Sequence, residues 1–200
     1  MSALRVSPIT VSEARAVVAR WHSHHAAPVG GLFAVSVRRG EDIVCVAIIG
    51  RPVARAFGNT SRGIAEVTRV ASDGAEHAAS MCIAAAARMA IAGGYRRVVS
   101  YTLIGEAGTS YRAAGWVVTG LVPASQGWHS RDGRTTMQGG AKVWWETGPD
   151  AEPANGAAAL VVGMCAGRVE VPSRRETGIP AVNWLGTNAV TVLQVLGGDL

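Results

Sequence analysis

The spacing of apolar residues changes repeatedly along the first third of the chain. Residues 4–9, LRVSPI, form a short extended segment. Ala14, Val17, Val18 and Trp21 then recur at the spacing of an amphipathic helix, and Thr10 or Ser12 is suited to cap its first turn. The runs LFAVSV and DIVCVAIIG, joined by RRGE, predict two strands of a hairpin, and GIAEVTRVAS predicts another strand.

The pattern becomes helical again from residue 75. The run AEHAASMCIAAAARMAIAGGY is nearly all helix-forming residues and ends at a glycine pair, which is a common helix stop. RRVVSYTLI predicts a strand, EAGTSYRAAGW a short helix, and WVVTGLV and AKVWWET two more strands. An antiparallel front half followed by a strand–helix–strand unit predicts a mixed α/β fold.

The domain organisation follows from these elements and from composition. Residues 1–148 are expected to form one domain, residues 149–157 have the composition of a linker, and residues 158–200 form a tail without a recognisable motif. No apolar run reaches 18 residues, and the N-terminus lacks the form of a signal peptide, so we expect a cytoplasmic protein with no membrane partner. Cys45, Cys82 and Cys165 lie among apolar neighbours and are predicted to be buried free thiols.

Charge adds one clue to this picture. The net charge is +5, and the basic residues comprise 18 Arg and one Lys. Residues 1–150 hold 16 basic and 10 acidic groups, so the positive charge belongs to that part of the chain. Arginine suits bidentate contacts with phosphates of nucleic acid or of a nucleotide cofactor, although a general preference for Arg over Lys on the surface explains the same count.

Three of the five histidines lie in the segment WHSHHAAPVG, at positions 22, 24 and 25. Imidazole titrates near neutral pH, so His24 or His25 is a candidate for acceptor contact or proton transfer. Ligation of a metal by at least one of the three, and a role in capping and packing, are the alternatives. No cysteine or HExxH pattern supplies further zinc ligands near them.

Further candidates for substrate binding lie at strand ends and in one loop. Arg51 and Arg55 flank a proline turn in GRPVAR, and Tyr101 and Thr102 stand near the end of a predicted strand. The polar loop after Pro123 combines aromatic and basic groups suited to stacking a base and holding phosphate. Its candidate residues are Trp128, Arg131 and Arg134. The arginine turn could instead be an ordinary surface turn, and the loop a solvated loop whose tryptophan packs against the protein.

Two stretches carry a resemblance to a known superfamily. The ending YRAAGW resembles the LYxxxGF ending of GNAT-type N-acyltransferases, and GGYRRVVSYT resembles their helix exit and following strand. The resemblance implies a GNAT-like α/β fold, with a central mixed, mostly antiparallel sheet flanked by helices. It also implies that Tyr111 protonates a departing thiolate and that Glu66 is a general base acting through water, with a structural ion pair as the alternative for Glu66. A splayed strand would pair with the pantetheine arm of acetyl-CoA or another acyl-CoA through Val67, Thr68, Arg69 and Val70.

The family's pyrophosphate loop reads Q/R-x-x-G-x-G/A, and this chain departs from it. Gly74 stands at the first position, His77 at the first essential glycine and Ala79 at the second. The phosphates would lie at the start of the helix near His77, where unpaired N–H groups and the helix dipole favour anions. His77 and Ser80 are candidate phosphate donors. Acyl-CoA held in a different way, a modified donor and the absence of a cofactor all stay open.

Four motifs together support a narrower resemblance. WHSHHAAPVGGLFAV, VAIIGRPVAR, EVTRVASDG and SYRAAGW are similar to a phage and prophage GNAT-like family that we group with the Mom-type DNA modification proteins. That resemblance implies an acyl or related group transferred to the exocyclic amine of a DNA base as protection from restriction, with DNA as partner and iron as a conceivable metal. The alternatives are an acetyl-CoA-dependent N-acetyltransferase of a small molecule or protein, and a catalytically inactive GNAT-like module that binds nucleic acid or protein.

Overall fold

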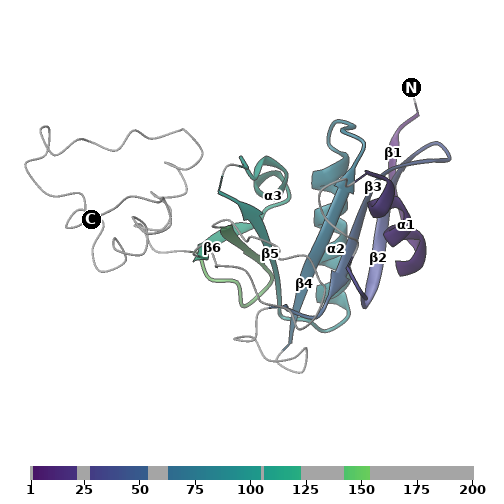
Figure 1. Ribbon diagram of the computed structural model, residues 1–200. Helices are drawn as coiled ribbons and strands as arrows, with labels where there is room; N and C mark the ends of the chain where they lie inside the picture. The colour runs from purple at the N-terminus through teal and green to yellow at the C-terminus, as the bar shows by residue number, and fades with distance from the viewer. Residues whose placement is uncertain (1, 22–27, 54–62, 105, 123–141, 154–200) are drawn as a thin grey trace, which may run out of the picture. The chain divides into compact units, whose positions relative to one another are not determined.

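The computed structural model describes residues 2–21, 28–53, 63–104, 106–122 and 142–153, and confirms the mixed α/β class. Its seven strands form one sheet in the order β1-β2-β3-β4-β5-β7-β6 (Figure 1). The elements are β1 (Leu4–Ile9), α1 (Val11–Trp21), β2 (Phe33–Arg39), β3 (Asp42–Gly50), β4 (Ile64–Ser72), α2 (Ala78–Ala92), β5 (Arg97–Leu103), α3 (Thr109–Ala113), β6 (Val117–Val122) and β7 (Lys142–Thr147).

The contacts divide the chain into two compact units. The first unit comprises residues 1–100, 108–117 and 146–152, and the second comprises residues 101–107, 118–145 and 153–200. In the first unit β1 to β4 pair consecutively in antiparallel order. β5 then pairs with β4 in parallel, because α2 returns the chain to the end of the sheet at which β4 begins.

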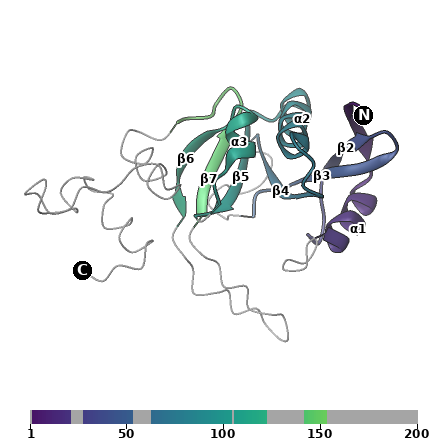
Figure 2. The ribbon, with the colours of Figure 1, turned by 90° about the horizontal axis from the view of Figure 1, so that it is seen from above.

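The core of the first unit lies on both faces of β3. Residues 44–50 of this strand are all buried, which a strand achieves only when both sheet faces are covered. Figure 2 shows α1 and α2 on opposite faces of the sheet. The α1 side of the core is a cluster of small and β-branched residues, namely Ala14, Val17, Val18, Ala34, Val46, Ile48 and Ala71.

A capping box starts α1. The Thr10 N–H and hydroxyl donate to Glu13 Oε2 at 2.9 and 2.6 Å, and the Glu13 N–H donates to Thr10 Oγ1 at 3.2 Å. The hydrogen bonds from the Thr10 side chain and backbone hold the pKa of the Glu13 carboxyl below its usual value. Thr10, rather than Ser12, is therefore the cap.

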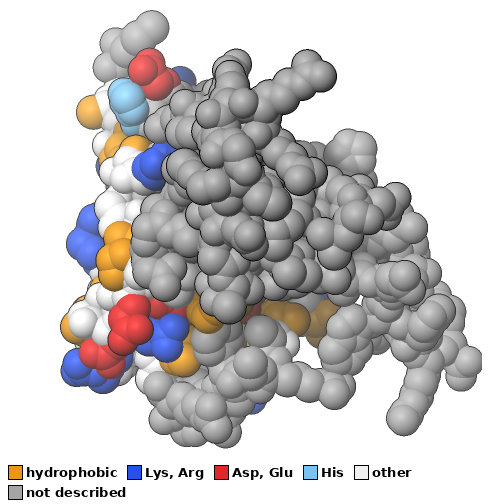
Figure 3. Space-filling model, turned by 90° about the vertical axis from the view of Figure 1, so that its left-hand side faces the viewer, with side chains coloured by type: hydrophobic (Ala, Val, Ile, Leu, Met, Phe, Trp, Pro, Cys, Tyr) orange, Lys and Arg blue, Asp and Glu red, His pale blue; other side chains and the backbone are white. Residues whose placement is uncertain are grey.

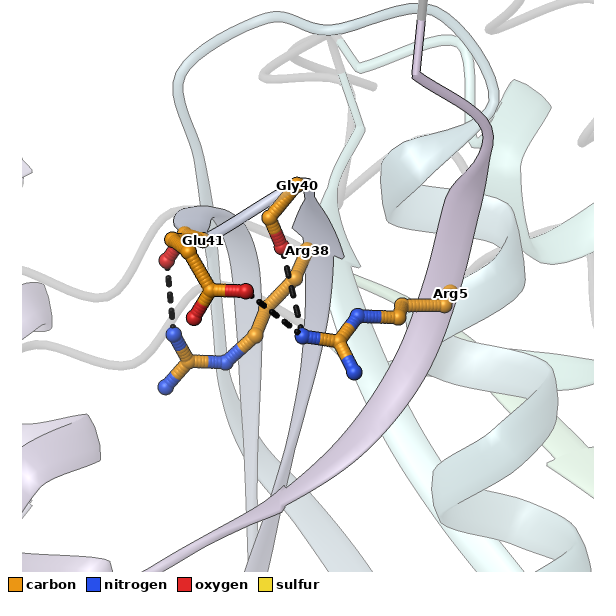
Figure 4. A network of polar contacts seen from close by, with 4 residues as sticks. All are labelled: Arg5, Arg38, Gly40 and Glu41. Atoms are coloured by element: carbon orange, nitrogen blue, oxygen red, sulfur yellow. Dashed lines mark hydrogen bonds and ion pairs between the residues drawn. The ribbon is translucent and has the colours of Figure 1, made fainter.

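The β2–β3 turn is tied to the edge strand β1. An Arg5 guanidinium nitrogen lies 3.3 Å from the Gly40 carbonyl oxygen and 3.4 Å from Glu41 Oε1, while Arg38 donates to the Glu41 carbonyl oxygen at 2.7 Å (Figure 4). These groups are exposed, so we expect the ion pair to add little stability.

Two of the three predicted free thiols, Cys45 and Cys82, lie in the described residues. Both are buried, and neither forms a disulfide. The Cys82 thiol donates to the Val35 carbonyl oxygen at 3.5 Å. Hydrogen bonding with Cys45 and burial raise the pKa of the Cys82 thiol, so it stays protonated. Cys165 lies outside the described residues.

The last described segment of the first unit is bound to the start of β5. Glu146 is fully buried and pairs with the Arg97 guanidinium, and Asp150 forms a bidentate pair with Arg96 at 2.5 and 2.6 Å. The Asp150 N–H also donates to the Arg96 carbonyl oxygen at 3.3 Å. Asp150, in the segment 149–157 to which composition gave the role of a linker, thus makes specific contacts with the domain. The division into domain, linker and tail stays a prediction.

Gly148 allows this segment to approach Arg96, and its replacement tests the contact. Its φ is 121°, and a Cβ atom there would lie 2.4 Å from the Arg96 carbonyl oxygen. We expect Gly148→Ala to lower the free energy of unfolding by roughly 3 kcal/mol, because strain and overlap add. Gly74→Ala is the matched control: its φ is 93° but nothing lies within 4 Å of the added Cβ. We expect a loss of only about 1 kcal/mol there, measured by denaturant unfolding. Equal losses at the two positions would contradict the contact.

Candidate functional site

The candidate site lies where the parallel ladder between β4 and β5 ends. That ladder contains three residue pairs, Ile64 with Arg97, Ala65 with Val98, and Glu66 with Val99. The pairing of β4 with β3 on its other edge continues to Ser72. The β4–β5 ladder thus ends at Glu66, and the splayed strand over Val67–Val70 that the resemblance implies stays a prediction.

Glu66 is the last residue of β4 in this ladder. Its side chain is buried, with 6% of the residue exposed, and its Oε2 accepts the Val53 N–H at 2.7 Å. Val53 follows Arg51 and Pro52 in the segment after β3. The carboxylate predicted as general base thus also holds the segment that contains Arg51.

A chain of three groups lies at the end of the ladder. The Ser100 hydroxyl donates to the Val67 carbonyl oxygen at 3.0 Å, and its Oγ lies 2.7 Å from the Tyr111 hydroxyl. Ser100 and Tyr111 are 1% and 8% exposed. Tyr111, predicted as the general acid, is therefore linked to the β4 backbone through the Ser100 hydroxyl.

The motif YRAAGW fixes the position of Tyr111. Gly115 has a φ of 79°, which reverses the chain after α3, and the Trp116 N–H donates to the Tyr111 carbonyl oxygen at 3.0 Å. The Trp116 ring then contacts the Tyr111 ring edge to face, with centroids 5.3 Å apart and planes at 82°. The glycine and the two aromatic residues thus act together to orient the phenol.

The side chains of the predicted cofactor strand are held in different ways. The Thr68 hydroxyl donates to the Ile48 carbonyl oxygen at 3.1 Å. Arg69 is half-buried, and burial lowers the pKa of its guanidinium. A donor would therefore contact this strand through its backbone, as the resemblance implies for Val67 to Val70, and that contact stays a prediction.

The start of α2 has an unusual backbone. His77, directly before the helix, has a φ of 63°, and it is the only residue other than glycine with positive φ in the part of the chain that the structure describes. The first bond of the helix runs from the Met81 N–H to the His77 carbonyl oxygen at 3.0 Å. A position that GNAT-type enzymes fill with glycine thus keeps a conformation typical of glycine although it carries an imidazole.

The side chains of this turn are already engaged. The Ser80 hydroxyl donates to the His77 carbonyl oxygen at 3.0 Å. The His77 side chain is 75% exposed and lies 3.3 Å from a Glu76 carboxylate oxygen. Ser80 would have to change rotamer to donate to a phosphate, so the backbone N–H groups around Ala79 are the better anion donors.

In the second unit, Tyr101 and Thr102 contact two tryptophans of β7. The Trp145 indole N–H donates to Thr102 Oγ1 at 3.0 Å, and both residues are buried. The Tyr101 and Trp144 rings lie 6.4 Å apart, tilted by 35°. Thr102 thus has a packing role here, and substrate contact by these two residues stays a prediction.

Several predicted residues lie outside the described residues. They are His24, His25, Arg55, Trp128, Arg131 and Arg134. Arg51 is described and exposed at the end of β3. Among the described residues no three His, Cys, Asp or Glu side chains form a group that could hold a metal, and no helix is long and apolar enough to cross a membrane.

Sequence reasoning missed Ser100 and the pairing of Glu146 with Arg97. Ser100 directly follows the buried valines 98 and 99, and a hydroxyl at the end of such a run needs a partner. The sequence therefore indicated that the Ser100 hydroxyl needs a hydrogen-bond partner. It did not indicate that this partner is Tyr111, eleven residues later.

Comparison with solved structures defines the class of fold. A Staphylococcus aureus N-acetyltransferase matches with a TM-score of 0.54 at 10% identity, over 75% of this chain and 100% of that one. The Salmonella typhimurium protein yncA, solved with acetyl-CoA, matches with a TM-score of 0.52 at 11% identity, over 76% and 98%. The Escherichia coli ribosomal-protein-S18-alanine N-acetyltransferase gives 0.52 at 10% identity, over 76% and 98%. The chain has the GNAT acetyltransferase fold.

A sequence model of the Mom protein family matches residues 3–148. The chain therefore belongs to the Mom protein family, and both expected resemblances are confirmed. A search of curated protein sequences finds no significant match.

The backbone of His77 yields a stability prediction. We expect His77→Gly to raise the free energy of unfolding by about 1 kcal/mol, because glycine adopts positive φ without the Cβ clash. His77→Ala is the control, since it removes the imidazole and its contact with Glu76 but keeps the Cβ. Denaturant unfolding should show no gain for the alanine variant. Equal gains for both variants would assign the effect to the imidazole instead.

Proposed function

We propose that this protein transfers an acyl or related group to an exocyclic amine of a DNA base. One observation carries the proposal: in a chain of the Mom protein family, a buried tyrosine hydroxyl lies beside the β4 backbone at the point where the β4–β5 ladder ends. The resemblance to Mom-type DNA modification proteins supports the choice of acceptor. The GNAT fold supports group transfer to an amine.

Transfer to an amine needs a group that takes a proton and a group that gives one. Glu66 takes the proton of the attacking amine through a water molecule. Its Oε2 also accepts the Val53 N–H at 2.7 Å, which holds the carboxylate in place. Tyr111 gives its proton to the leaving thiolate. Glu66 directly precedes Val67 in β4, and Ser100 links Tyr111 to the Val67 carbonyl oxygen.

The donor is an acyl thioester such as acetyl-CoA or a variant of it, and it supplies the activated acyl carbon. The β4 backbone from Val67 onward would hold its amide groups, and the N–H groups at the start of α2 would hold its phosphates. The positive φ of His77 supports this assignment, because the loop keeps the turn that glycine provides elsewhere.

DNA binding rests on residues outside this site. On the face drawn in Figure 3, basic and acidic side chains of the described residues are interspersed, so this part of the surface offers no large single-sign patch. We therefore assign phosphate and base contacts to Arg51 and to the loop with Trp128, Arg131 and Arg134. Arg131→Ala combined with Arg134→Ala should weaken DNA binding and reduce its salt dependence.

The first test is mass spectrometry of nucleosides from the DNA of cells that express the protein. We expect a new modified base whose mass identifies the transferred group. Tyr111→Phe should lower its amount at least about tenfold, since a general acid contributes roughly 100-fold or more to a rate. Phenylalanine keeps the ring that packs on Trp116, so the variant should remain folded. An unchanged nucleoside profile with soluble, folded protein would overturn the proposal.

Acetylation of a small molecule or protein is the second candidate, favoured by the fold shared with yncA, whose structure contains acetyl-CoA. Calorimetric titration with acetyl-CoA tests the donor. We expect binding that His77→Gly preserves or strengthens and that a bulkier change on the α2 start, Ala79→Val, weakens. No heat at high acetyl-CoA concentration would exclude this candidate and would point to a different donor.

A further inference from the structure

We propose that Ser100 is a positioning residue that keeps Tyr111 protonated and fixes its hydroxyl at the end of the β4–β5 ladder. This inference rests on the proposed function, because it concerns the step in which Tyr111 protonates the leaving thiolate. It adds a residue to the site that neither the motif nor the fold assigned.

The location of Ser100 gives the first argument. The residue directly follows Val99, the last β5 residue of the ladder, and it is 1% exposed. Val98 and Val99 before it are fully buried. A hydroxyl in such surroundings costs free energy unless it is hydrogen-bonded. Ser100 meets this need with two partners, the Val67 carbonyl oxygen and the Tyr111 hydroxyl.

The direction of these bonds gives the second argument. Ser100 has one hydroxyl proton, and that proton is donated to the Val67 carbonyl oxygen, which can only accept. At 2.7 Å the Tyr111 hydroxyl must then donate to Ser100 Oγ. Only a protonated phenol completes this chain. A phenolate would have to draw the serine proton away from Val67. The arrangement thus favours the form of Tyr111 that a general acid requires.

The surroundings of Tyr111 give the third argument. The Trp116 ring and the turn at Gly115 orient the aromatic ring, and the hydrogen bond with Ser100 holds its oxygen end. α3 has only five residues, so it holds its side chains weakly by itself. Ser100 therefore holds the phenol oxygen from which the proton is transferred.

The step balances with these groups and an acyl thioester. The amine attacks the acyl carbon, a C–N bond forms and the C–S bond breaks, while the amine proton passes to Glu66 through water. The Tyr111 O–H turns from Ser100 Oγ to the thiolate, its O–H bond breaks and the S–H bond forms. Ser100 then turns its proton from the Val67 oxygen to the phenolate, until a proton returns from Glu66 through solvent. The net reaction converts thioester and amine into amide and thiol.

A matched pair of variants tests the role of the hydroxyl in the modification reaction. Ser100→Thr and Ser100→Val have nearly the same size and suit a strand, but only threonine keeps the hydroxyl. We expect the modified base in cellular DNA to accumulate at least about tenfold more slowly with Ser100→Val, and within about threefold of wild type with Ser100→Thr. In a Tyr111→Phe background the valine variant should have no additional effect. Equal rates for the two variants would overturn the inference.

A second readout does not depend on activity. The chain has three tyrosines, so labelling with ¹³Cζ-tyrosine gives three NMR signals, and the Tyr111 signal is the one absent in Tyr111→Phe. Ser100→Val should shift that signal, and Ser100→Thr should leave it near its wild-type position. If Ser100→Val does not fold, Ser100→Ala replaces it. An unmoved Tyr111 signal would overturn the inference. A moved signal, together with no modified base in cells that express the wild-type protein, would overturn only the proposed function.

Discussion

The pairing of β4 constrains everything else in the first unit. β4 pairs with β3 along most of its length but with β5 at three positions, so it belongs fully to the sheet on one side and only at its start on the other. The helices α1 and α2 cover opposite faces of β3, the strand with which β4 pairs along most of its length. On the other edge of β4, the pairing with β5 ends next to Val67, whose carbonyl oxygen accepts the Ser100 hydroxyl. The candidate chemistry is concentrated at that transition.

Much of the fold could be predicted because local patterns and tertiary packing agree. Helical spacing in residues 14–21, the glycine stop of α2 and the hairpin turn at residues 38–41 all place their elements correctly. The contacts that close the unit could not be predicted in the same way. The pairs Arg97 with Glu146 and Arg96 with Asp150 join residues that are 49 and 54 positions apart, and sequence spacing does not encode such long-range partners.

The candidate site shows the same division. Tyr111 and Glu66 could be proposed because a recognisable motif and strand position exist for each of them. Ser100 lacked a motif, and its role became visible only when strand pairing brought it to Val67 and Tyr111. For His77, the residue type and the backbone conformation point in different directions. Its residue type suggested that the loop differs from that of related folds, whereas its backbone keeps a left-handed turn. Residue identity and backbone conformation are thus separate kinds of evidence at a phosphate loop.

The bond between Glu66 and Val53 has a consequence for the proposed role of Glu66 as general base. A carboxylate accepts an N–H bond about twice as strongly as a neutral carboxylic acid does. When Glu66 takes up a proton, its hold on the segment after β3 therefore weakens, and it recovers when the proton leaves. Under the proposed mechanism, the segment that contains Arg51 would be held less firmly while Glu66 is protonated.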